Sequence, residues 1–233
     1  MRSAQVTTIV TAFNCEPFGG DALRSVLAQT EGEVIVVDDA STDATASVVA
    51  ECPSVRYLRH DANSGPAAAR NTGLSAARGE VIAFLDGDDL WSPEKMAMQL
   101  AHLEREPGLQ IVLGRLRFFH TPEVPADDEA HLVYSFGAAL VRREAFERAG
   151  PIDESLRFGE DTDWFLKVRE LEIPTHVHDD VVLLYRRHES NMTLERTAET
   201  RKADLFGVIR RSVKRRQEGG QPASSLPVLG HRR

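Results

Sequence analysis

The sequence predicts one α/β domain, with a Rossmann-like, mostly parallel central sheet flanked by helices. Its 233 residues are 42% hydrophobic, which suffices for one globular core. Val6–Phe13 and Glu33–Asp38 are short, apolar and β-branched, as strands buried on both faces of a parallel sheet are. Pro17–Gln29 between them has its apolar residues on one helical face, so the chain opens with a βαβ unit.

The alternation of helices and strands continues to residue 106. We expect helices over Thr42–Glu51, Pro66–Ala77 and Pro93–Glu106, and strands over Val55–Arg59 and Glu80–Leu85. Such alternation is typical of sheets with helices on both faces. Ligands of these sheets bind beyond the carboxyl ends of the strands, so the polar residues that follow each strand are the first candidates for a site.

The second half of the chain is less regular, but it can still be built on the same sheet. Apolar segments lie at Leu109–Phe119, Phe136–Val141 and Val177–Tyr185. Helices are expected near Arg143–Ala149 and Gly159–Leu171.

The last part differs in composition, which divides the chain into residues 1–200 and a C-terminal region, 201–233. Residues 201–216 can form an amphipathic helix with a basic face, and the Gly, Pro, Ser and Gln content from Gly219 onward predicts disorder. Residues 201–233 carry nine Lys or Arg against two acids, although the whole chain has a net charge of −8. The acidic remainder argues against nucleic acid as a partner, whereas the basic helix suits an anionic membrane.

The sequence also bears on location. It has no apolar run of about 18 residues and no signal-peptide pattern. Cys15 and Cys52 lack CxxC spacing, so neither a disulfide framework nor a zinc site is expected. We therefore expect a cytoplasmic protein whose contact with the inner face of the membrane, if it has one, is peripheral and made through residues 201–216.

Two acidic motifs follow predicted strands. Asp86-Gly87-Asp88-Asp89 would be self-repelling without a cation, and Mg²⁺ or Mn²⁺ prefers carboxylate and phosphate oxygens; the alternative is an Asp-rich turn that caps the next helix. Asp38 and Asp39 end the second strand, where a carboxylate can bind a nucleobase imide or ribose hydroxyls. Turn chemistry alone is the alternative for that pair.

Three further features carry charge or a metal-binding group. Arg70, on an Ala-rich helix, suits a phosphate or one of the aspartates, or is a solvated surface residue. Glu160 and Asp161 open a helix, where the helix dipole favours acids, but a carboxylate there can also serve as a general base. His188 follows the last strand as a candidate metal ligand or an ordinary surface or core residue.

Together these segments resemble the family 2 glycosyltransferases with a GT-A fold, over roughly residues 5–193. The matching motifs, in the family's order, are TIVTAFN, VVDDASTDAT, NSGPAAARNTG followed by GEVIAFLDGDDLW, GAALVRREAFERAGPIDESL, and FGEDTDWFLKV. Each motif alone is weak, but five in order are specific. The QxxRW-like signature and transmembrane helices of processive relatives are missing from this sequence, so polymer synthesis is not expected.

The resemblance implies an inverting transfer from a nucleoside diphosphate sugar, with a UDP-sugar expected, to an acceptor hydroxyl of a glycan, a lipid-linked sugar or a small molecule. It implies that Asp88 and Asp86 hold a divalent ion, Mg²⁺ or Mn²⁺, against the donor diphosphate, with His188 near the metal. Asp161 is implied as the catalytic base, with Glu160 beside it. The donor site implied by the same comparison comprises Thr11, Ala12, Phe13, Asn14, Asp38, Asp39, Gly65, Arg70 and Asp86.

Three other classes fit the sequence less well. A receiver domain needs its acidic pair after the first strand and a Lys after the fifth, whereas LQIVLGRLRFF has no Lys. A sugar-phosphate nucleotidyltransferase needs a basic, Gly-rich loop after its first strand, and TAFNCEPFGG has neither Lys nor Arg. A non-catalytic sugar-nucleotide-binding module would have lost a metal or base residue, and all of these are present.

Overall fold

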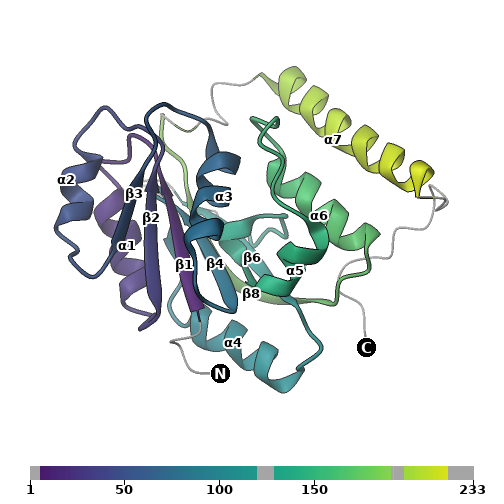
Figure 1. The fold of residues 1–233 in the computed structure, drawn as a ribbon, viewed down its shortest axis with the longest axis horizontal. Helices are drawn as coiled ribbons and strands as arrows, with labels where there is room; N and C mark the ends of the chain where they lie inside the picture. Colours follow the sequence, from purple (N-terminus) through teal and green to yellow (C-terminus); the bar gives the residue numbers. More distant parts are fainter. Residues whose placement is uncertain (1–5, 120–128, 190, 192–196, 220–233) are drawn as a thin grey trace.

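The computed structural model describes residues 6–119, 129–189, 191 and 197–219, and Figure 1 shows its fold. In chain order the helices and strands are β1 (Val6–Ala12), α1 (Gly19–Leu27), β2 (Glu33–Asp38), α2 (Thr45–Ala50), β3 (Arg56–Arg59), α3 (Pro66–Ala76), β4 (Val81–Asp86), β5 (Leu90–Trp91), α4 (Lys95–Arg105), β6 (Ile111–Phe119), the 3-10 turn η2 (Phe136–Ala138), β7 (Ala139–Arg142), α5 (Arg143–Ala149), α6 (Glu160–Glu170), β8 (Thr175–Arg186) and α7 (Ala198–Glu218).

The strands form a mixed sheet of eight, in the order β3-β2-β1-β4-β7-β6-β8-β5. The predicted parallel half is confirmed: β1 pairs in parallel with β2 and β4, and β2 with β3. The register pairs Ala12 with Asp38 and Thr11 with Asp86. The carboxyl ends of β2, β1 and β4 therefore meet at one edge of the sheet, as the βαβ pattern predicts.

The less regular second half extends the same sheet. β7 runs antiparallel to both β4 and β6, β8 is parallel to β6, and the short β5 is antiparallel to β8. β5 was not predicted, because two residues leave no readable periodicity in a sequence. The helix expected from Pro93 begins two residues later, with Glu94 as its N-cap in a left-handed conformation.

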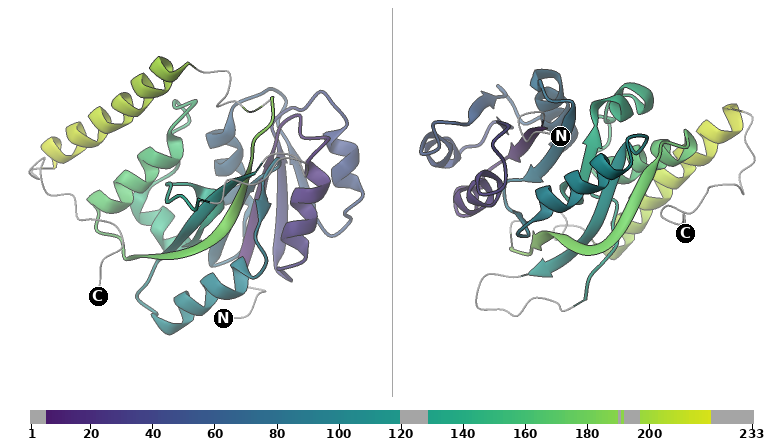
Figure 2. Two further views of the ribbon diagram at one scale, coloured as in Figure 1. Left: turned by 180° about the vertical axis from the view of Figure 1, so that it is seen from behind. Right: turned by 90° about the horizontal axis from the view of Figure 1, so that it is seen from below.

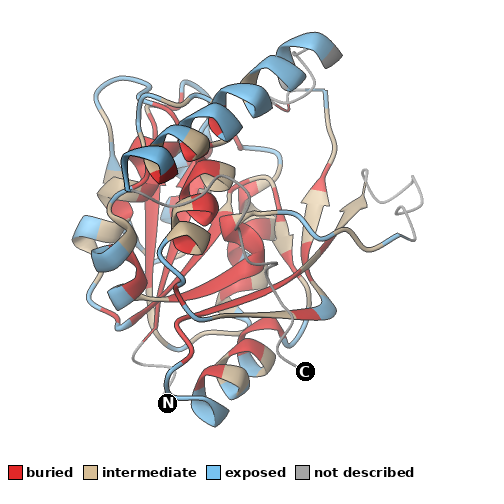
Figure 3. Ribbon diagram, turned by 90° about the vertical axis from the view of Figure 1, so that its right-hand side faces the viewer, coloured by how far each residue is buried: buried red, intermediate tan, exposed pale blue. Residues whose placement is uncertain are grey.

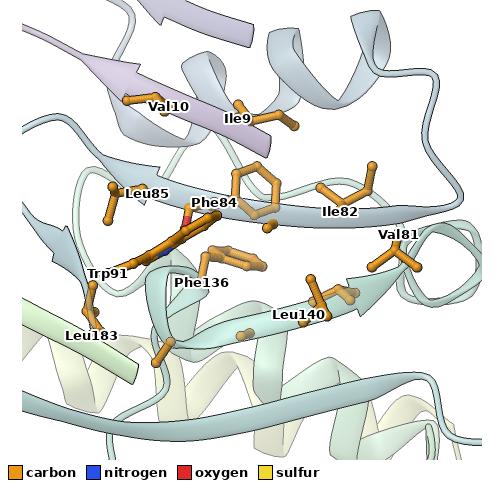
Figure 4. Close-up of a cluster of buried hydrophobic side chains, with 14 of the residues drawn as sticks. Ile9, Val10, Val81, Ile82, Phe84, Leu85, Trp91, Phe136, Leu140 and Leu183 are labelled. Carbon is orange, nitrogen blue, oxygen red and sulfur yellow. The ribbon is translucent and has the colours of Figure 1, made fainter. Parts of the chain in front are cut away.

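The core lies on both sides of β1 and β4, where Figure 4 shows apolar side chains in close contact. Phe84 of β4 contacts Phe136 of η2, with ring centroids 5.2 Å apart, and Phe136 in turn contacts Trp164 of α6 at 5.2 Å. Aromatic pairs at these separations bind through both buried area and ring geometry. This cluster fixes the start of α6 against the sheet.

Helix α3 lies unusually close to β1 because Gly73 has no side chain. A Cβ atom added to Gly73 would be 2.3 Å from Cγ2 of Ile9, which is a severe overlap. Arg70 lies one helical turn earlier on the same face of α3 and is buried as well. The close packing therefore brings a guanidinium to the carboxyl edge of the sheet.

Helix α7 lies along α6, on the side of the molecule away from β1–β3 (Figures 1 and 2). Arg215 joins the two helices by ion pairs with Glu170 (2.8 Å) and Asp163 (2.7 Å), and Ser212 donates to Glu170. Figure 3 shows the buried sheet and the largely exposed outer face of α7. In the described part of the chain, no helix has the length and apolar character needed to cross a membrane. The predicted disorder from Gly219 onward falls on residues 220–233, outside the described residues.

Candidate active site

Arg70 joins the two halves of the protein at the carboxyl edge of the sheet. Its Nη2 donates to Asp86 Oδ1 at 2.8 Å, and its Nη1 lies 2.8 Å from Glu160 Oε1 and 3.3 Å from Asp161 Oδ1. The Arg70 side chain is only 4% exposed. Burial by itself would lower the pKa of Arg70, but the carboxylates of Asp161, Asp86 and Glu160 raise it above its usual value. Arg70 is thus a permanent buried cation and not a solvated surface residue.

Asp86 ends β4 and is open to solvent on one side. Thr11 of β1 donates its hydroxyl to Asp86 Oδ1 at 2.7 Å, as the β1–β4 register allows. The Asp86 side chain is nevertheless 38% exposed, so part of the carboxylate remains available to a ligand. Asp86 is therefore fixed by two protein donors while it still faces outward.

Asp161 lies in the first turn of α6, and its carboxyl group is nearly buried. Phe136 of η2 donates its backbone N–H to Asp161 Oδ2 at 2.9 Å. Burial raises the pKa of Asp161 to about 7; Glu160 and Asp86 add to this effect, while Arg70 and the Phe136 N–H oppose it. A carboxyl group with a pKa near the working pH is suited to take up and release a proton.

The turn after β4 approaches the backbone of β1 so closely that Gly87 is required. Gly87 donates its N–H to Thr11 O at 2.8 Å, and a Cβ atom there would be 2.9 Å from Cys15 Sγ and 3.1 Å from Thr11 O. None of the three aspartates of this turn caps α4. The N-cap residue of α4 is Glu94, and its side chain makes no capping hydrogen bond. Capping therefore does not explain the acidic motif.

The three aspartates of the turn differ in their surroundings. Asp89 is buried, accepts the Arg186 N–H at 2.8 Å, and has a pKa raised by burial and by Asp88. Asp88 Oδ2 is 3.0 Å from His188 Nε2, and the amide nitrogen of Asn191 lies 3.5 Å from the same oxygen. Asp88 and His188 thus bring together a carboxylate oxygen and an imidazole nitrogen, one from the turn after β4 and one from the segment after β8.

The donor atoms at this turn fit a hard divalent cation that also binds a diphosphate. Among the described residues, no group of three His, Cys, Asp or Glu side chains forms a complete metal site. Mg²⁺ and Mn²⁺ are commonly held by one or two carboxylates, with substrate phosphates and waters completing the shell. The pair formed by Asp88 and His188 could supply such a partial set of protein ligands.

The second acidic motif is held by protein donors. Asp38 is fully buried and accepts hydrogen bonds from Ser41, Tyr57 and Arg59. Burial would raise the pKa of Asp38, but the hydrogen bonds from Tyr57 and Ser41 lower it below its usual value. Asp39 is nearly as buried. Its carboxylate accepts the N–H groups of Ser64 and Gly65 at 2.8 and 2.7 Å, and its Oδ1 lies 2.7 Å from His60 Nδ1.

The end of β1 lies beside these two aspartates. Ala12 is buried and its carbonyl accepts the Asp39 N–H, whereas the Phe13 side chain is exposed. Asn14 has a φ of +48°, and its side-chain oxygen accepts the Thr42 N–H at 2.8 Å. The structure therefore brings β1, Asp38, Asp39 and the Gly65 loop together beside the group formed by Arg70, Asp86, Glu160 and Asp161. A donor role for Asp38 and Asp39 stays a prediction.

Three residues of the site were missed from the sequence. Phe18 packs against His188 with ring centroids 4.3 Å apart, and Arg186 donates its Nε to Asp88 O at 2.8 Å. Asn191 accepts the His188 N–H at 2.6 Å through its side chain. Of these three residues, only Asn191 could have been recognised from the sequence, because an amide side chain three residues after a candidate metal ligand is suited to a local turn.

Solved structures share this fold. Over 92% of this chain and 66% of the other, the structure resembles S. aureus TarS 1-349 in complex with UDP-GlcNAc, with a TM-score of 0.74 and 23% identity. The mannosyltransferase PcManGT from Pyrobaculum calidifontis, in complex with GDP-Man and Mn²⁺, gives a TM-score of 0.73 at 23% identity over 90% of this chain and 64% of that one. The fold is thus the GT-A fold of these glycosyltransferases.

The sequence model described as Glycosyl transferase family 2 matches residues 7–123, and the chain belongs to that family. The succinoglycan biosynthesis protein ExoO of Rhizobium meliloti (strain 1021) is 37% identical over 186 residues, which are 67% of this chain and 53% of that protein. The chain spans less than two thirds of the curated relatives first matched.

Proposed function

We propose that this protein is an inverting, metal-dependent glycosyltransferase that moves a sugar from a nucleoside diphosphate sugar, a UDP-sugar, to an acceptor hydroxyl in polysaccharide, glycolipid or glycoconjugate synthesis. One observation carries the proposal: buried Arg70 links Asp86, at the strand edge where donors bind, to Asp161, a carboxyl group with a pKa of about 7. A donor-side acid and a candidate base thus pair with the same buried cation, which fixes them close to each other.

Asp88 and His188, with Asp86, would hold the cation, Mg²⁺ or Mn²⁺. When bound, such an ion neutralises the charge that develops on the departing diphosphate. The Asp88–His188 distance of 3.0 Å and the partial exposure of both side chains support this assignment. Arg186, through Asp88 O and the aromatic face of Phe18, keeps this turn in place beside β8.

Asp161 would take the proton of the attacking acceptor hydroxyl through Oδ1, since Oδ2 accepts the Phe136 N–H. Glu160 shares the Arg70 guanidinium and would keep it oriented between the acids. A single displacement of this kind inverts the configuration at the anomeric carbon. The donor site would be formed by Thr11, Ala12, Phe13, Asn14, Asp38, Asp39 and Gly65. In this site the exposed Phe13 side chain would offer its ring to the nucleobase of the donor.

The pH dependence of turnover follows from the pKa of Asp161. The group acts as a base only when ionised, so kcat/KM is expected to rise about tenfold per pH unit below pH ~7 and to level off above it. The measurement is the initial rate at low donor concentration between pH 5 and 9. A rate independent of pH between 5 and 7 would contradict the assignment of the base.

A panel of nucleotide sugars separates the proposal from its rivals. Thermal stabilisation by UDP- and GDP-sugars, with and without Mn²⁺, identifies the donor, because a ligand that binds only the folded state raises the melting temperature. Product analysis then shows a free nucleoside diphosphate for a glycosyltransferase. Pyrophosphate exchange with a sugar phosphate would indicate a nucleotidyltransferase, and metal-dependent binding without turnover would indicate a binding module.

Contact with an anionic membrane is a second element of the proposal. On α7, Leu205, Phe206 and Ile209 are exposed, Phe206 by 65%, while Val208 and Ser212 are buried. Lys202, Arg210 and Lys214 are exposed around this apolar strip. An apolar strip bordered by cations suits the interface of an anionic bilayer, with a lipid-linked sugar as the acceptor class.

Cosedimentation with vesicles tests this contact. We expect the protein to sediment with phosphatidylglycerol vesicles, less with neutral phosphatidylcholine vesicles, and much less after Phe206→Ser with Ile209→Ser. Ala203→Ser, on an exposed position of the same helix, is the control. Equal sedimentation of wild type and the double variant would remove the membrane from the proposal. Loss of a dimer in the double variant would assign the strip to a second copy of the chain.

A further inference from the structure

The first residue of helix α4, Lys95, is completely buried, and its contacts do not include the aspartates of the acidic turn. Lys95 Nζ donates to Gln99 Oε1 at 2.8 Å and to Ala139 O at 3.1 Å, and it lies 4.5 Å from the ring centroid of Trp91. The three ammonium protons thus face a side-chain amide, a backbone carbonyl and an aromatic ring. Within the described ranges, Lys95 forms no ion pair with a carboxylate.

Gln99, one helical turn later, is also fully buried, and every polar atom of its side chain has a partner. Oε1 accepts from Lys95, while Nε2 lies 3.0 Å from Ala138 O and 3.2 Å from His178 Nε2. Because the amide nitrogen can only donate, His178 must accept through Nε2 and direct its Nδ1 toward Asp180, 3.2 Å away. Burial lowers the pKa of His178, which favours this neutral, accepting form.

Both carbonyls held by this pair belong to one short segment. Ala138 ends the 3-10 turn η2 and Ala139 begins β7. The other end of η2 is Phe136, whose N–H donates to Asp161 Oδ2 at 2.9 Å. The turn therefore has its carbonyl end bound to α4 and its amide end bound to the carboxyl group that we propose as the base.

We infer that Lys95 and Gln99 are positioning residues that hold η2 so that its Phe136 N–H orients the Asp161 carboxylate. The inference rests on the proposed function of Asp161 as the base.

Core filling alone does not account for these residues. Methionine fills a similar volume without the cost of burying an ammonium or an amide, and buried polar groups are retained at that cost only with all their hydrogen bonds made. Burial lowers the pKa of Lys95 to about 7, which shows how far this site disfavours a charge. A residue that only filled the core would be better apolar.

The test uses Gln99→Met and Lys95→Met in the full chain, with Gln110→Met as the control. Gln110 is also buried, but its side chain contacts Arg148, away from η2. The first readout is the pKa of Asp161, measured by NMR titration of ¹³C-labelled aspartate and assigned with Asp161→Asn. Removing the support of the Phe136 N–H weakens a bond to the ionised carboxylate, so we expect the pKa of Asp161 to rise in both variants and to stay unchanged in Gln110→Met.

The second readout is turnover of a UDP-sugar with Mn²⁺. We expect kcat to fall about tenfold and KM for the donor to stay within about twofold, because the donor site is built on other strands. If Lys95→Met does not fold, Gln99→Glu is used instead, which still accepts from Lys95 but cannot donate to Ala138 O. If the variants fold and the pKa of Asp161 is unchanged in them, the inference is overturned. It is also overturned if the wild type is active and the variants have the same kcat. Absence of turnover in the wild type would count against the proposed function, while the NMR titration would still decide the positioning role.

Discussion

Asp161→Asn is expected to lower sugar transfer by about a thousandfold while it leaves donor binding nearly unchanged. An asparagine can still accept the Phe136 N–H, so the start of α6 keeps its place, but an amide cannot take the acceptor proton. Positioned general bases typically contribute about 10² to 10⁴ in rate. The measurement is kcat with the identified donor and acceptor, together with the donor Kd by calorimetry in the presence of Mn²⁺.

The control for this change is Asp179→Asn, which makes the same substitution at an exposed position paired only with Arg115. We expect both its rate and its donor affinity to match the wild type. A rate for Asp161→Asn within about tenfold of the wild type would mean that another group takes the proton, and Glu160, on the same Arg70 guanidinium, would be the first to test.

Asp88→Asn is expected to remove metal-dependent donor binding. Asparagine can keep the hydrogen bonds to His188 and Asn191, so the turn should fold, but it lacks the negative charge that a hard divalent cation requires. In a thermal-shift titration, the stabilisation by a UDP-sugar with Mn²⁺ should disappear, and the apparent Kd for Mn²⁺ should rise about a hundredfold.

Asp61→Asn, on an exposed loop position, is the matched control and should retain the full stabilisation. The metal assignment fails if the Asp88 variant binds the donor with wild-type affinity in the presence of Mn²⁺. Retained binding without any metal in both proteins would mean that protein cations and hydrogen bonds alone hold the diphosphate.

Much of the parallel half was readable from the sequence. β-Branched runs such as Glu33–Asp38 carry enough periodicity and punctuation to define strands, and the rule for strand carboxyl ends then predicts that Asn14, Asp39 and Asp86 lie at one edge. The structure confirms that arrangement through the parallel register of β1, β2 and β4. The helix expected over residues 201–216 forms part of α7, while the division of the chain at residue 200 stays a prediction.

The long-range parts were not readable. The ion pairs of Arg70 with Glu160 and Asp161 join residues 90 and 91 positions apart, and no local pattern specifies such a contact. The burial of Asp38 and of Asp89 depends on neighbours from β3 and β8. Asp88 and Asp89 are adjacent, identical letters, yet Asp89 is buried while the Asp88 side chain is partly exposed. Nothing in the sequence indicates that Lys95 is buried, because burial of a lysine is set by tertiary packing.

The Arg70 guanidinium, which reaches from α3 to α6, also limits how this protein can diverge in sequence. On the proposed function, a new acceptor specificity would come from changes in the second half of the chain. Any replacement for that half must return two carboxylates to the Arg70 guanidinium, or leave this buried cation with Asp86 as its remaining carboxylate partner. Chimeras that exchange everything after β6 should therefore succeed only when the graft brings its own acidic pair at the start of α6.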